Sequence, residues 1–130
     1  MADSDALAIA QDYEAMAGYV ADILGDSSIT LSAAQTQRLN DCGERLTQYA
    51  DSVAIGAALS ALAASQNDIA KICAATNKAN AAAAALKSQV AKINSVLQIL
   101  GDAVSLGAAI AAGPLTGVLA AATTLASDCP

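Results

Sequence analysis

Residues 65–104 read SQNDIAKICAATNKANAAAAALKSQVAKINSVLQILGDAV, in which a polar tetrapeptide precedes a long, regular pattern. Ser65 and Asp68 have the spacing of a helix N-terminal cap. The residues after them recur at steps of three and four, as apolar residues do along one face of a helix. The stretch therefore predicts a helix over about 66–112 that follows a turn at Gln66. Its stripe comprises Ile69, Ile72, Thr76, Ala79, Ala83, Leu86, Val90, Ile93, Leu97, Leu100 and Val104.

Two earlier segments have the same spacing. The first predicts a helix over about 4–25, which ends at the polar break 25–28. Ser32 and Gln35 then form a capping box, so a second helix is expected over about 32–64. The first stripe comprises Ile9, Tyr13, Met16, Val20 and Ile23, and the second comprises Leu39, Cys42, Leu46, Tyr49, Val53 and Gly56.

The stripes also predict how these helices pair. Reflecting the second and third about Gln66 sets large side chains against small ones, such as Tyr49 against Ala83, which favours an αα-hairpin. Because residues 65–68 contain no Gly or Pro, one unbroken helix from 32 to 100 is the alternative. Reflecting the first and second stripes about the point between Ser27 and Ser28 pairs Tyr13 with Cys42. This pairing places the first helix on the second.

The C-terminal part is strongly apolar, and residues 103–127 contain no charged side chain. Pro114 fits the first turn of a helix, so a fourth helix is expected over about 115–127. Residues 101–127 would then form an apolar helical hairpin. A second apolar face from Val96 onward indicates that the third helix has more than one neighbour. The expected interaction face of the hairpin consists of Leu106, Ile110, Leu115, Val118 and Leu119.

Composition points to the same class of fold. The chain has 130 residues, of which 55% are hydrophobic but only 2% aromatic, and alanine supplies the difference. Alanine is the best helix former and contributes little to sheets. We therefore expect an all-α protein with a single domain over 1–130: an elongated antiparallel bundle of three to four helices with an Ala-rich core.

The residues that carry chemistry are scarce. The chain has no histidine and its three cysteines fit no zinc motif, so no metal, cofactor or catalytic site is expected. Cys42 and Cys73 are expected to be buried and unlinked, whereas Cys129 should be accessible. The net charge of −6 argues against nucleic acid as a partner. The start MADSDALAIA lacks a basic segment, which predicts cytoplasmic synthesis without a signal peptide and leaves leaderless export open.

Two function classes remain. The favoured one is a non-enzymatic interaction or structural protein that self-associates, or docks on a protein partner, through small-residue helix faces. The alternative is a membrane-active protein that inserts its C-terminal hairpin and is similar to helical pore-forming toxins in shape alone. The hairpin is long enough to span a bilayer, but Pro114 divides it and its flanks Asp102 and Asp128 are acidic.

Overall fold

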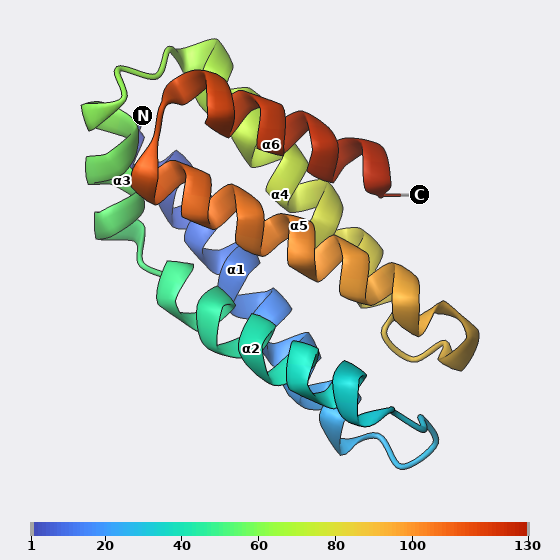
Figure 1. Ribbon diagram of the computed structural model, residues 1–130. Helices are drawn as coiled ribbons and strands as arrows, with labels where there is room; N and C mark the ends of the chain where they lie inside the picture. The colour runs from blue at the N-terminus through green and yellow to red at the C-terminus, as the bar shows by residue number, and fades with distance from the viewer. Residues whose placement is uncertain (1, 130) are drawn as a thin grey trace.

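The computed structural model describes residues 2–129, with side chains from Ser4 onward, and this part of the chain is all-α (Figure 1). Six α-helices pack together, and no strand occurs in the described part. A short 3-10 turn, η1 (Val90–Lys92), precedes the fifth helix. The helices are α1 (Ala2–Gly25), α2 (Ala33–Tyr49), α3 (Ser52–Ala61), α4 (Gln66–Leu86), α5 (Ile93–Ala112) and α6 (Leu115–Asp128).

Four of the helices form a ring in the order α1, α2, α5, α4, in which each packs on its neighbours. The α6 helix packs on α4 and α5, and α3 crosses one end of the bundle, where it contacts α1 and α5 (Figure 1). Gln66 at the start of α4 donates to Asp5 near the start of α1, and Lys87 after the end of α4 donates to Asp22 near the end of α1, so α1 and α4 run parallel. The described part of the chain therefore forms six helices where the sequence predicted three or four.

The predicted starts of α2 and α4 are confirmed. The Ser32 hydroxyl accepts from the Gln35 amide while the Gln35 side chain accepts from the Ser32 amide. Ser65 and Asp68 form the same reciprocal pair. Each box satisfies two backbone donors that a helix N-terminus would otherwise leave unpaired.

The predicted helix over 32–64 is wrong, because it is two helices. The Asp51 carboxylate accepts from the backbone amides of Val53 and Ala54, at 3.0 and 3.1 Å, and so starts α3 in a new direction. The turn takes Val53 out of the core, and its side chain is 80% exposed.

The predicted helix over 66–112 is also wrong, since it ends at Leu86 and the chain reverses through η1. Lys87 forms an ion pair with Asp22 of α1 and lies over the ring of Tyr19, which ties the turn to the end of α1. After the turn α5 runs antiparallel to α4 and parallel to α2. The αα-hairpin about Gln66 therefore does not form, and Tyr49 lies against Gly107 of α5 and not against Ala83.

The predicted neighbour of α1 is correct, but its register is not. The ring of Tyr13 packs edge-on against Tyr49, with 5.9 Å between centroids, where the stripes had paired it with Cys42. Cys42 and Tyr49 are seven residues apart in the sequence. Because a heptad stripe offers an equivalent surface at every seventh residue, the pattern alone did not distinguish these two registers.

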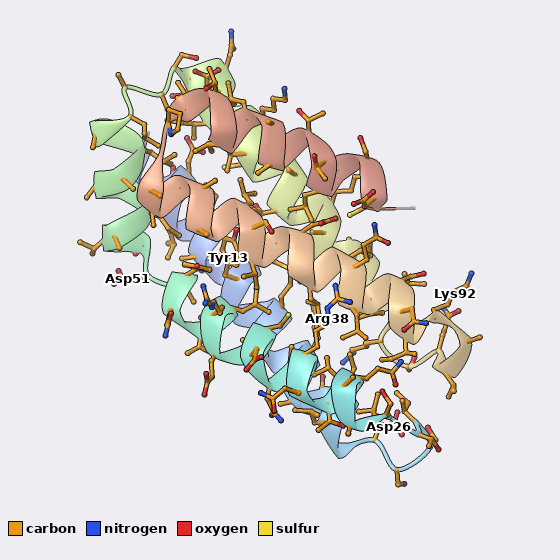
Figure 2. The ribbon with its side chains drawn as sticks, viewed as in Figure 1. Tyr13, Asp26, Arg38, Asp51 and Lys92 are labelled. Carbon is orange, nitrogen blue, oxygen red and sulfur yellow. The ribbon has the colours of Figure 1, made fainter. Side chains whose placement is uncertain are left out.

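The apolar face beginning at Val96 faces further neighbours, as predicted. Val96 and Leu97 are both buried, as are Ile99 and Leu100, because α5 has helices on several sides. Tyr13 of α1 points into the bundle (Figure 2) and its hydroxyl donates to the carbonyl of Ala103 at 2.8 Å. This bond satisfies the hydroxyl of a fully buried tyrosine.

Candidate functional site

The five residues of the predicted interaction face lie where α5 and α6 enter the core. Leu106, Ile110 and Val118 are buried, while Leu115 and Leu119 are half-buried. The predicted packing of the C-terminal helix on the preceding one is present, since α6 contacts both α5 and α4. Most of this face is therefore covered by the chain itself, and Leu115 and Leu119 keep part of their surface exposed.

A different apolar surface lies at the end of the bundle, and α3 builds it. Between Asp51 and Asp68 the chain has no charged residue. Ile55 and Leu59 of α3 point inward, which leaves an outer face of small side chains around Val53. We call this face of α3 the uncharged cap; its exposed residues are Val53, Ala54, Ala57, Ser60 and Ala61.

The turn between α5 and α6 lies beside the uncharged cap. A Cβ atom placed on Gly113 would be 2.8 Å from the Leu62 side chain at the end of α3. Gly113 has a φ of 68°, a left-handed conformation that favours glycine. The exposed residues here are also uncharged: Ala111, Ala112, Pro114, Thr116 and Gly117.

The opposite end of the bundle is charged. Asp26 and Lys92 lie in its two connections, away from Asp51 (Figure 2). The Lys87–Asp22 ion pair is also found there. Val90 in η1 is 49% exposed, so this end too has an exposed valine, but among charged neighbours.

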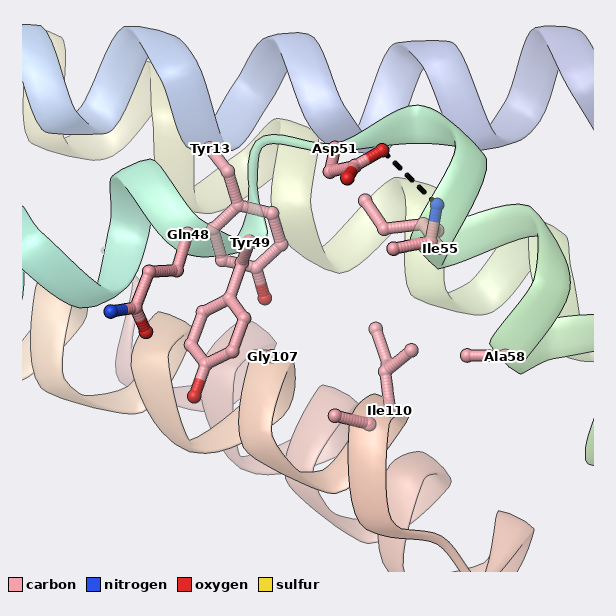
Figure 3. A pocket seen from close by; sticks show the side chains of 10 residues that line it. Tyr13, Gln48, Tyr49, Asp51, Ile55, Ala58, Gly107 and Ile110 are labelled. Atoms are coloured by element: carbon pink, nitrogen blue, oxygen red, sulfur yellow. Dashed lines mark hydrogen bonds between the residues drawn. The ribbon is translucent and has the colours of Figure 1, made fainter.

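A small cavity lies beneath α3, between the ends of α2 and α5 (Figure 3). It measures about 60 Å³, and its walls include the rings of Tyr13 and Tyr49 together with Ile55, Gly107 and Ile110. Typical small-molecule sites are several times larger, at roughly 300–1,000 Å³. The cavity is therefore too small for a typical substrate or cofactor.

Polar side chains meet where α1 packs on α4; Thr76 is buried, and Asp12 and Asn80 are half-buried. Asp12 accepts hydrogen bonds from Thr76, at 3.0 Å, and from Asn80, at 3.1 Å. Burial raises the pKa of the Asp12 carboxyl, and the two hydrogen bonds partly offset that effect. The three side chains hold α1 against α4. The cavity beneath α3 is not lined by any of them.

A second polar cluster lies where the end of α6 meets α5. The carboxyl groups of Asp102 and Asp128 are neighbours there. Burial, which is the largest cause, and the neighbouring Asp128 together raise the pKa of Asp102 to about 7, while Arg38 acts against both. The sequence pattern did not point to this pair, since it treated both residues only as acidic flanks of the apolar segment.

The three cysteines are free. Cys42 and Cys129 are buried and Cys73 is half-buried. The prediction that Cys129 is accessible is wrong, because the end of α6 folds onto the bundle and the thiol donates to the Leu125 carbonyl. Burial raises the pKa of each thiol, that of Cys73 to about 11, which keeps them protonated and weakly nucleophilic at neutral pH.

Two further features of the described residues concern metal binding and membrane insertion. Within the described residues, no group of three or more His, Cys, Asp or Glu side chains could hold a metal ion. The segment Val90–Ala112 is long and apolar enough to cross a membrane by length and composition. A core helix meets the same criterion, and α5 contributes eight buried residues to the core.

No family model matches the chain. No curated protein and no solved structure shows significant similarity to it.

Proposed function

We propose that this protein is a non-enzymatic helical protein that self-associates through the uncharged cap. The observation that carries the proposal is Val53, a large apolar side chain that is 80% exposed on a helix without charge. Apart from Asp51, which caps the helix, the exposed residues around Val53 on this helix are alanines and a serine, and such small residues let helices approach closely. Covering this face removes apolar surface from water, which favours association.

The occupant we propose for the cap is a second copy of the same chain. With a net charge of −6, two copies repel each other over most of their surfaces. The cap and the adjacent turn carry no charged side chain, so contact there brings the least like charge together. A twofold pairing of α3 with its copy would be the simplest closed arrangement.

Sedimentation equilibrium with a matched pair of variants tests the proposal. The wild type is expected to form dimers as its concentration rises. Val53→Asp places a charge on the cap and should give a monomer at all concentrations. Val90→Asp, the same change at the charged end, should dimerise like the wild type. A wild type that stays monomeric, or equal dimerisation of both variants, would contradict the proposal.

Membrane activity is the second candidate, and the span Val90–Ala112 favours it. Insertion would require α5 and α6 to leave the bundle, which exposes Leu97 and Leu100 and breaks the bond from Tyr13 to Ala103. These losses rank it below self-association. Leakage of dye from anionic lipid vesicles by a monomeric wild type would support the membrane candidate instead.

A further inference from the structure

The end of α6 is held to α5 by acidic side chains whose positions leave one oxygen unsatisfied. Asp128 is the last residue of α6, and its carboxylate accepts from the Gln98 side-chain amide at 3.3 Å. Asp102 lies one turn further along α5. Its Oδ2 atom is buried and has no hydrogen-bond partner, although the Asp128 carboxyl is its neighbour.

Among the described residues, no Lys or Arg side chain forms a direct ion pair with Asp102 or Asp128. Arg38 of α2 lies nearby, but its guanidinium donates to the Leu97 carbonyl at 3.4 Å. Lys78 of α4 donates to the Ala126 carbonyl at 2.9 Å. Of the described residues, Lys87 and Asp22 alone form an ion pair within 4 Å, at the far end of α1.

The other titratable groups around Asp102 and Asp128 do not neutralise the two carboxylates at neutral pH. On α2, Asp41 and Arg45 line the groove beside Val104 and oppose each other in charge. The Tyr13 hydroxyl of α1 is bonded to the Ala103 carbonyl, and the Cys129 thiol is protonated because burial raises its pKa. Two ionised carboxylates would therefore repel each other at a partly buried site.

We propose that the end of α6 is a latch, closed by a proton that Asp102 and Asp128 share and opened when that proton leaves. A protonated carboxyl donates to the other carboxylate, which satisfies the buried oxygen and removes the repulsion. The inference is independent of self-association, since the latch lies at the far end of α6 from the uncharged cap.

The direction of the pH response follows from the two states. In the closed latch the pKa of Asp102 is raised to about 7, whereas in the open latch it returns toward the ordinary value near 4. The closed state is thus most stable below about pH 4. Its advantage is lost progressively up to about pH 7 and does not change further above that pH.

Opening would uncover a defined part of the molecule. Ala122, Leu125 and Cys129 are buried against the bundle in the closed state. The other described bond that joins the end of α6 to α4 is the one from Lys78 to Ala126. Release of the last turns would therefore expose a thiol and an apolar strip together.

Amide hydrogen exchange of residues 122–128, corrected for intrinsic rates, tests the latch in the full chain from about pH 4 to about pH 8. In the wild type the opening constant should rise by up to about tenfold per pH unit between about pH 4 and 7, then level off. Asp102→Asn stays neutral and can still donate to Asp128, so its protection should be independent of pH. Glu14→Gln, which changes an exposed carboxylate on α1, should behave like the wild type.

Two results would overturn the latch. One is wild-type protection at 122–128 that does not change with pH, and the other is the same pH dependence in Asp102→Asn as in the wild type. If the asparagine variant does not fold, the carboxyl carbon resonance of Asp102 in the wild type decides. A midpoint near pH 7 supports the shared proton, whereas a midpoint near pH 4 contradicts it.

Discussion

Gly107 shows how one residue without a side chain can fix the position of a helix. The ring of Tyr49 lies flat enough on α5 that a Cβ atom at position 107 would be 2.3 Å from Tyr49 Cδ2. Such a distance is not tolerated, so α2 and α5 can be this close only because residue 107 is glycine. Reflection of the stripes about Gln66 had paired Tyr49 with Ala83, and Gly107 belonged to neither stripe.

Gly107→Ala should therefore destabilise the protein by about 1–3 kcal/mol, although alanine is the better helix former. Gly18→Ala is the matched control, because nothing lies within 4 Å of the added atom there. It should stabilise the protein by about 0.5–1 kcal/mol. Urea denaturation measures both changes, and effects of the same sign would contradict the position of Tyr49.

Thr76 provides a second test at the residue scale. It is fully buried, and its hydroxyl lies 3.0 Å from the Asp12 carboxylate and 3.1 Å from the Cys73 carbonyl. Thr76→Val keeps the shape but leaves Asp12 short of one donor, which should cost about 1–3 kcal/mol. Thr76→Ser retains the hydroxyl and should preserve the Asp12 contact. Equal losses in the two variants would show that packing, and not the hydrogen bond, matters at this position.

At the scale of helices, the sequence predicted where helices begin better than where they end. The capping boxes at Ser32 and Ser65 and the start of α6 after Pro114 were all found where local chemistry places them. The ends at Tyr49 and Leu86 were missed, because neither is marked by Gly or Pro. The break after Tyr49 depends on Asp51, which caps α3. The break after Leu86 depends on Lys87, whose partner Asp22 lies on α1 and is near only in the folded structure.

Asp51 decides the first of these breaks, so its removal should affect α3 in particular. Asp51→Ala leaves the amides of Val53 and Ala54 without their acceptor and should cost about 1 kcal/mol. Asp51→Ser can still cap the helix and should restore most of the loss. Faster amide exchange confined to the first turn of α3 would be the local signature, and unchanged exchange there would contradict the cap.

At the scale of the whole molecule, the all-α class and the neighbours α1–α2 and α5–α6 were predictable, but the register and the fold-back were not. Heptad stripes repeat, so several arrangements satisfy the same pattern. For the same reason, the surface that the sequence predicted for interaction differs from the uncharged cap found in the structure. Three residues of the expected interaction face, Leu106, Ile110 and Val118, lie in the core, whereas Val53, assigned to the core, is 80% exposed on the uncharged cap.

The central claim is that the apolar C-terminal segment forms the protein's own core. Ile110→Asp tests it most directly, because Ile110 is 4% exposed beneath the uncharged cap. A charge there should cost at least about 3 kcal/mol in the free energy of unfolding, measured by urea denaturation. Ser105→Asp, an exposed position on the same helix, should cost little. If Ile110→Asp instead unfolds at the same urea concentration as Ser105→Asp, the segment is not core and the account is wrong.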